Sequence, residues 1–297
     1  MKSATYSVSV IIPTLNAEKE LPGLLDRLHK QTLHPAEVIV IDSASDDNTS
    51  LVCAKDPSVR FIPIQREDFD HGRTRDIAIR TAKGDYVVFL TQDAIPANNE
   101  LLQRLTEPLI KGDAIVSTGR QLPKTDASYM EASVRAYNYP DTSAIRSRKD
   151  IPTLGIKTFF CSDVCSAYNK EIYLELGGFE YPIKTNEDML FAAKAINNGY
   201  SVAYVAEAIV YHSHELTLRQ QFRRNYIQGY EIERHKALLG AGSLASEGKK
   251  MVTHVVRDLL QKGHPISAAR FVADCTARYL GNRAGKYRYE WERKRTQ

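Results

Sequence analysis

The chain has 297 residues, of which 43% are hydrophobic and 26% are charged. It is long enough for one large α/β domain with an extension, or for two small domains. No run of about 18 apolar residues occurs and the start does not resemble a signal peptide, so we expect a protein of the cytoplasm or of the inner membrane face. The four cysteines are scattered, which favours buried thiols over a zinc site.

The charge is divided unevenly along the chain. Residues 217–297 carry 17 Lys and Arg against 7 Asp and Glu, a net +10, and the whole chain carries +4, which leaves −6 for residues 1–216. A basic tail indicates an anionic partner, and both lipid headgroups and nucleic acid fit that charge. Because no zinc-finger or RNA-recognition signature occurs, we expect no nucleic acid and predict that residues 217–297 meet an anionic membrane surface.

The first part of the chain alternates short apolar runs with amphipathic stretches. The apolar runs have the length and composition of buried strands and occupy residues 7–13, 38–41, 59–64 and 87–90. The helical patterns that separate them lie at residues 21–28, around residues 51–52 and at 71–82. This alternation predicts a parallel sheet with right-handed crossovers.

Three of these strands end in polar residues. Thr14, Asp42 and Asp93 follow the first, second and fourth strands, and Pro96 is expected to prevent the fourth strand from continuing. The three ends should share one sheet edge, which is where open α/β sheets bind ligands. Asp93 by itself is either a metal or phosphate site or the cap of a helix starting near Asn98. No Gly-x-Gly-x-x-Gly or Walker A sequence occurs, which argues against a dinucleotide domain or a P-loop.

Two arginines, Arg73 and Arg75, lie at the start of the helix predicted for residues 71–82. Beside the positive end of the helix dipole they would suit a pyrophosphate. The alternative is that they pair with the nearby acids Asp68, Asp70 or Asp76.

The second half of the chain has a weaker periodicity. Residues 120–157 read as a helix followed by a mobile loop, which is either a lid or substrate wall or a disordered insertion. Strands are predicted at residues 114–118, 159–168, 202–205 and 208–211. Helices are predicted at residues 98–111, between 186 and 198, and in the tail near 217–239, 246–261 and 265–281.

Two pairs of polar residues in this half are candidates for chemistry. Glu187 and Asp188 lie in the first turn of a helix, where acids also complement the helix dipole. His212 and His214 follow the last predicted strand, and only one of them would point inward if the strand continued. An isolated histidine at such a place is more often a surface or cap residue than a ligand.

Taken together, these stretches resemble the inverting nucleotide-sugar glycosyltransferases of family 2, which have a GT-A fold. The resemblance runs from Ser7 to His214, and the segments 69–75 and 90–94 are most similar to bacterial rhamnosyltransferases of surface polysaccharide synthesis. It implies an α/β domain with a mostly parallel sheet flanked by helices over residues 1–216. Residues 1–119 would be its nucleotide-binding half, residues 120–216 its acceptor and catalytic half, and 217–297 a helical extension.

The resemblance also implies roles for individual residues. The nucleotide-sugar donor would be bound by Pro13, Thr14, Asn16, Asp42, Gln92, Asp93, Arg73 and Arg75. Within this set Asp42 would accept a hydrogen bond from a pyrimidine base, and Arg75 would stand near the diphosphate.

A divalent cation, Mg²⁺ or Mn²⁺, is implied as well. The family's metal motif is Asp-x-Asp, but Thr91 occupies its first position here, so Asp93 would be the only acid that this strand gives to the metal. The resemblance places His212 as a second ligand, with His214 in reserve.

In the same family Asp188 would be the catalytic base and Glu187 would orient it or the acceptor. The leading hypothesis is transfer of rhamnose from dTDP-rhamnose to a lipid-linked saccharide. The alternative, motivated by the reduced metal motif, is a catalytically idle subunit that binds the nucleotide-sugar and scaffolds a membrane assembly. The helical tail would pack on the body, on lipid or on a second copy in a homo-oligomer.

Overall fold

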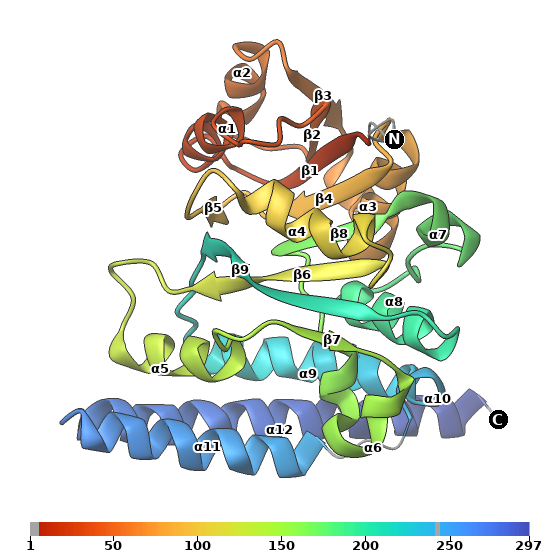
Figure 1. The fold of residues 1–297 in the computed structure, drawn as a ribbon. Coiled ribbons are helices and arrows are strands. Elements are labelled where there is room, and N and C mark those ends of the chain that lie inside the picture. Colours follow the sequence, from red (N-terminus) through yellow and green to blue (C-terminus); the bar gives the residue numbers. More distant parts are fainter. Residues whose placement is uncertain (1–5, 241–243, 297) are drawn as a thin grey trace.

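The structure is a computed structural model and describes residues 6–240 and 244–296. The strands of the described residues form one sheet in the order β3-β2-β1-β4-β8-β6-β9-β5, with β7 beside β9 (Figure 1). Their bounds are β1 Val8–Thr14, β2 Glu37–Asp42, β3 Val59–Pro63, β4 Tyr86–Leu90, β5 Ile95–Pro96, β6 Val116–Leu122, β7 Ala144–Arg146, β8 Cys165–Asn169 and β9 Val202–Tyr211.

Helices cover both faces of this sheet. Their bounds are α1 Leu21–His29, α2 Thr49–Ala54, α3 His71–Thr81, α4 Leu101–Ile110, α5 Tyr129–Asn138, α6 Ile151–Leu154, α7 Lys170–Glu175, α8 Glu187–Asn197, α9 Leu218–Arg234, α10 Lys236–Leu239, α11 Leu244–Gln261 and α12 Pro265–Thr296. Short 3₁₀ turns lie at Arg66–Asp68, Arg148–Asp150 and Gly155–Phe159. The leucines of α1 and α4 pack on one face, and α3 and α8 pack on the other. The α/β architecture predicted from the alternating pattern is therefore confirmed.

The sheet is mixed in direction. Strands β1 to β4 pair in parallel, as their spacing predicts, and β6 pairs in parallel with β9. Strand β8 runs antiparallel to both of its neighbours, β4 and β6, and so joins the two parallel groups. One continuous sheet thus carries the ends of β1, β2 and β4 to the same edge.

Several predicted boundaries were wrong for identifiable reasons, although the fourth strand does stop as predicted, since β4 ends at Leu90. Pro96 lies in a separate two-residue strand, β5, at the sheet margin, where a missing N–H is tolerated. The strand expected over residues 159–168 begins only at Cys165, after a turn around the buried Asp163. The strands expected at 202–205 and 208–211 are one strand, β9, whose pairing with β6 shifts register after Gly119.

Residues 120–157 contain more regular structure than the predicted helix and loop. The predicted helix is present as α5, but the remainder contains β7, which pairs with β9, and α6. Helix α5 packs Met130 and Val134 against Val255 and Phe271 of α11 and α12. This segment therefore joins the tail to the sheet.

The tail is a helical layer along the base of the molecule (Figure 1). Helix α12 runs to Thr296 instead of ending near residue 281. It packs against α9 with the two backbones in close contact. A Cβ added to Gly285 would lie 1.9 Å from the carbonyl oxygen of Tyr226, so only glycine allows this approach of the two backbones. Among the described residues, no helix is both long enough and apolar enough to cross a bilayer.

The Gly285→Ala variant should lower the free energy of unfolding by about 1–3 kcal/mol, because the methyl group forces α12 away from α9. The matched control is Gly248→Ala on α11, where an added Cβ meets no atom within 4 Å. That change should be neutral or stabilise the protein by up to about 1 kcal/mol, since alanine favours a helix. Urea unfolding measures both, and equal effects would contradict the proposed helix crossing.

Candidate active site

The ends of β1, β2 and β4 meet at one edge of the sheet, as the sequence predicts. The Thr14 hydroxyl donates to Asp42 Oδ1 at 2.8 Å. The Gln92 side chain, just after β4, forms two hydrogen bonds with the backbone of Leu15, of 3.0 Å and 3.3 Å. These contacts bring the predicted donor-binding residues of three strands together.

Asp42 is buried and rigidly oriented. Its Oδ1 also accepts from the Ser45 hydroxyl at 2.5 Å, and its Oδ2 accepts from the Ser45 backbone at 2.9 Å. A carboxylate has about four lone-pair sites, so this one can accept a further hydrogen bond. Asn16 adopts the left-handed backbone region that asparagine tolerates (φ 54°), and its Oδ1 accepts from the Asp46 backbone. Pro13 lies beside Thr14 and is half-buried.

Asp93 lies in a cluster with two histidines. Its Oδ2 is 3.0 Å from His214 Nε2 and 3.5 Å from His212 Nε2, and Lys124 Nζ is 3.8 Å away. One ligand atom from each of Asp93, His212 and His214 lies within 4.8 Å of the others. Because β9 ends at Tyr211, the expected alternation of the two histidines does not apply, and both side chains reach Asp93.

The protonation states in this cluster suit a cation. Burial lowers the pKa of His212 to about 3, so its imidazole is neutral near pH 7 and can bind a metal. Burial alone would raise the pKa of Asp93, but His214 and His212 beside it hold that pKa well below its usual range.

The donor atoms also fit a divalent metal ion. Asp93 Oδ2 is buried and forms no hydrogen bond of good geometry within residues 6–240 and 244–296. A carboxylate oxygen with two imidazole nitrogens suits Mn²⁺ better than Mg²⁺, which prefers oxygen ligands. Asp93, His212 and His214 are therefore the residues that would hold the ion.

A second charged cluster surrounds Arg75. Its guanidinium is buried, with Nε 3.3 Å from Asp163 Oδ2 and an η nitrogen 3.3 Å from Glu187 Oε1. Asp163 also accepts from the hydroxyls of Ser166 and Tyr168, each at 2.6 Å. One arginine thus lies between two buried acids from different parts of the chain.

Asp188 lies next to this cluster at the start of α8. Its carboxylate accepts from the backbone N–H groups of Asp163, at 3.1 Å, and Met189, at 2.7 Å. Burial, followed by the charges of Glu187 and Asp163, raises the pKa of Asp188 well above its usual range. Burial likewise raises the pKa of Asp163 to about 6, against the opposing effect of Arg75. A carboxyl with a raised pKa is a better proton acceptor near neutral pH.

The two predicted arginines are in different environments. Arg75 reaches the acids described above, whereas Arg73 is exposed and its backbone N–H donates to the helix cap Asp70 at 2.9 Å. The alternative pairing with Asp76 is wrong, because that acid pairs with Arg80 at 2.7 Å. Asp70 likewise pairs with neither arginine side chain, since it accepts from backbone N–H groups.

Sequence reasoning missed four residues of the site: Asp163, His71, Lys124 and Gln121. Asp163 had a signal, since it is a lone acid inside an apolar run. His71 lies 3.8 Å from Glu187, and burial together with Arg75 lowers its pKa to about 4. No pattern in the nearby sequence points to Lys124 or Gln121, because their partners are distant in the chain. Lys124 lies near Asp93, after β4, and Gln121 contacts His212, after β9.

With this geometry in view, comparison with known proteins places the chain in a family. The family model described as glycosyl transferase family 2 matches residues 9–177, more than half of the chain. The chain belongs to glycosyl transferase family 2. It is therefore a glycosyltransferase with a GT-A fold, as the sequence motifs indicate.

Two relatives are similar over most of their length. The chain is 37% identical to the O-antigen chain rhamnosyltransferase RfbN of Salmonella typhimurium, covering 94% of this chain and 90% of that protein. It is 36% identical to the O-antigen chain rhamnosyltransferase WbaN of Salmonella anatum, covering 95% and 90%.

Among solved structures, the mannosyltransferase PcManGT from Pyrobaculum calidifontis, in complex with GDP-Man and Mn²⁺, has the same fold. It superposes with a TM-score of 0.65 over 98% of this chain and 88% of that one, at 17% identity. The similarity supports the GT-A assignment, and the ligands named are those of that protein.

Replacing Glu187 by Gln should lower the pKa of Asp188, because a negative charge that opposes its ionisation is removed. Carbon-13 NMR titration of the Asp188 carboxyl, in protein labelled at aspartate, measures the shift. Glu171→Gln, an exposed acid on α7, is the control and should leave the titration unchanged. An unchanged or higher Asp188 pKa in the Glu187 variant would show that the two carboxylates do not interact as described.

Proposed function

We propose that this glycosyltransferase transfers L-rhamnose from dTDP-rhamnose, with inversion, to a lipid-linked saccharide in surface polysaccharide synthesis. The two curated relatives, both named as O-antigen chain rhamnosyltransferases, support the sugar and the pathway class. The main observation in favour of Asp188 as the catalytic base is its position. Its carboxylate is buried, has a raised pKa and lies next to Glu187, which pairs with Arg75.

In this proposal Asp188 accepts the proton of the acceptor hydroxyl. The hydroxyl oxygen forms a bond to the anomeric carbon while the bond from that carbon to the diphosphate oxygen breaks on the opposite face, which inverts the configuration. Burial, together with Glu187, which Arg75 holds in place, keeps the pKa of Asp188 high, and Glu187 would orient Asp188 or the acceptor.

The donor would lie along the edge formed by β1, β2 and β4. Its base would meet Asp42 in the pocket of Pro13, Thr14 and Asn16, next to Gln92. A divalent cation held by Asp93, His212 and His214 would offset the negative charge that develops on the diphosphate. The positive charges of Arg73 and Arg75 would also stabilise the negative charge on the departing diphosphate.

The acceptor would approach from the side of the tail. Arg224 on α9 is exposed to solvent. Desolvation and the charges of Arg278 and Arg135 lower its pKa. Such clustered guanidinium groups favour a phosphate-bearing acceptor. Residues 1–119 would then serve as the nucleotide half and 120–216 as the acceptor half.

Asp188→Asn should reduce kcat by about 10²- to 10⁴-fold, because the amide cannot accept the proton. Purified protein is assayed with Mn²⁺, a lipid-linked acceptor and a panel of dTDP- and UDP-sugars, and the variant's nucleotide binding is measured as the control for folding. Wild-type turnover by the variant would contradict the mechanism. A preference for a UDP-sugar would contradict the donor, and absence of metal-dependent turnover by the wild type would favour the idle subunit.

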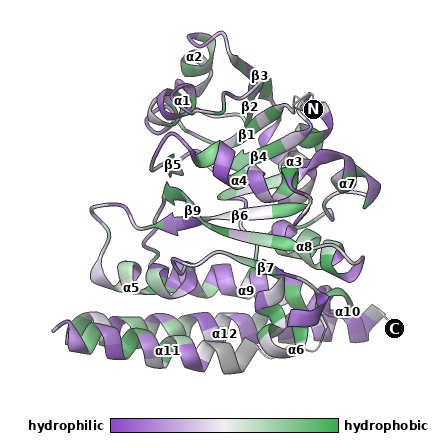
Figure 2. Cartoon of the chain, in the orientation of Figure 1, coloured by the Kyte–Doolittle hydropathy of each residue, from purple (hydrophilic) through white to green (hydrophobic). Residues whose placement is uncertain are grey.

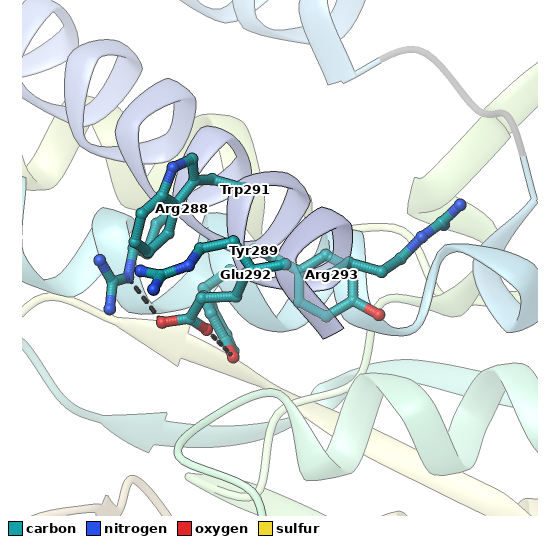
Figure 3. Close-up of a pocket in the computed structure, with 7 residues that line it drawn as sticks. Arg288, Tyr289, Trp291, Glu292 and Arg293 are labelled. Carbon is teal, nitrogen blue, oxygen red and sulfur yellow. Dashed lines mark hydrogen bonds and ion pairs between the residues drawn. The ribbon is translucent and has the colours of Figure 1, made fainter. Parts of the chain in front are cut away.

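The tail offers a surface suited to anionic lipid. Apolar side chains of α12 are exposed, among them Ile266 (85%) and Tyr287 (70%), and hydrophobic and hydrophilic residues alternate along α11 and α12 (Figure 2). Near the end of α12, Arg288 lies beside Trp291 (Figure 3), with its guanidinium carbon 4.8 Å from the centre of the ring. The guanidinium carbon of Arg295 is 4.6 Å from the centre of the same ring. Tryptophan with arginine is typical of membrane interfaces. We therefore propose that this layer contacts the inner face of the cell membrane.

Arg295→Gln should weaken binding to vesicles of anionic phospholipid by about fivefold, the equivalent of about 1 kcal/mol per basic residue at the surface. Flotation with anionic and neutral vesicles measures this. Lys55→Gln, the same charge change beside α2 at the far end of the molecule, is the control. Equal losses in both variants would contradict a specific lipid-facing surface, and a stable dimer without vesicle binding would assign the surface to a second copy.

A further inference from the structure

Gln121, on β6, links the Asp93 cluster to helix α5. Its side chain is almost fully buried, and its Oε1 accepts a hydrogen bond from an η nitrogen of Arg135. The same Oε1 lies 3.1 Å from His212 Nδ1. On its other side, Gln121 Nε2 donates to the Ser162 hydroxyl at 3.0 Å.

Arg135 determines which way this amide points. A guanidinium has only donors, so the amide atom that faces it must be the carbonyl oxygen. Ser162 imposes no such choice, since a hydroxyl both donates and accepts. Arg135 is itself held in place by Glu131, 2.7 Å away on the same helix, and lies over the Tyr139 ring.

The orientation of the amide in turn determines the tautomer of His212. An amide oxygen can only accept, so His212 Nδ1 must carry the proton that it donates to Gln121. The neutral ring has a single N–H, which leaves a lone pair on Nε2. That lone pair faces Asp93 Oδ2 at 3.5 Å. Two acceptors that face each other repel, and a cation between them would satisfy both.

His214 has no such constraint. Its side chain is about half exposed, its Nε2 lies 3.0 Å from Asp93 Oδ2, and no amide carbonyl faces its other ring nitrogen in the hydrogen bonds of the described residues. The two histidines are chemically different partners of Asp93.

We propose that Arg135 and Gln121 are positioning residues that hold His212 in the Nδ1–H tautomer, so that its Nε2 is ready to bind a divalent cation. Partners of this kind, behind the direct ligands, orient metal-binding histidines in many proteins. The inference rests on the metal site of the proposed function but not on the identity of the sugar or acceptor. It assigns His212 as the preorganised ligand and His214 as the unconstrained one.

The tautomer can be observed directly in the metal-free protein. Long-range ¹H–¹⁵N correlation spectra of ¹⁵N-histidine protein distinguish Nδ1–H from Nε2–H, and the His212→Ala spectrum assigns the signal. The wild type should show Nδ1–H. In Arg135→Met the amide can turn and donate to Nδ1, so the Nε2–H form should appear. Nε2–H in the wild type would overturn the proposal.

Metal affinity supplies the second measurement. Mn²⁺ titration followed by electron paramagnetic resonance, with dTDP present, should show about ten- to hundredfold weaker binding in Arg135→Met. Arg27→Met, the same substitution at an exposed arginine of α1, is the matched control and should retain both tautomer and affinity. Unchanged affinity in a folded Arg135→Met protein would contradict the proposal.

A further pair of variants covers the case in which Arg135→Met does not fold. Gln121→Glu keeps an acceptor for Nδ1–H and should retain the tautomer, whereas Gln121→Met removes it and should weaken Mn²⁺ binding. The same affinity in both would contradict the role of Gln121. These readouts do not involve turnover, so absence of rhamnosyl transfer in a protein with the expected tautomer would count against the proposed function alone.

Discussion

The ion pairs of Arg75 are the interaction on which the catalytic side of the sheet depends. This one buried guanidinium joins the start of α3, the turn before β8 through Asp163, and the start of α8 through Glu187. Breaking a buried pair leaves an uncompensated charge and is strongly unfavourable, so these three segments are held together. Burial, followed by the excess negative charge of three acids around one arginine, keeps the pKa of Asp188 high.

The Asp93 cluster also contains a buried carboxylate, but its neighbours are histidines instead of a buried arginine. Here the buried carboxylate of Asp93 faces two imidazoles, of which His212 is kept neutral by burial, so its three donor atoms suit a divalent cation. Hydrogen bonds of Gln121 connect the two clusters. Gln121 contacts His212 on one side and Ser162, the neighbour of Asp163 in the chain, on the other. The candidate metal site and the candidate base are therefore linked by hydrogen bonds, an arrangement that would suit transfer between two bound substrates.

Local patterns in the sequence predicted the sheet edge well. Thr14, Asp42 and Asp93 each end an apolar run, and that pattern is visible within ten residues. Partners distant in the chain could not be predicted this way, since His212 and Gln121 are 91 residues apart and the pairing of β6 with β9 brings them together. The length of α12 was missed for a related reason: Gly285 weakens a helix by propensity, and only the approach of α9 explains it.

The central claim is that Asp93 and His212 form the metal centre at the edge where the donor binds. The most direct measurement is anomalous X-ray diffraction from crystals of the wild-type protein with Mn²⁺ and dTDP. A manganese peak bonded to Asp93 Oδ2, His212 Nε2 and the diphosphate is the predicted result. A peak that touches Asp93 but not His212, or that lies away from Asp93, would contradict the account.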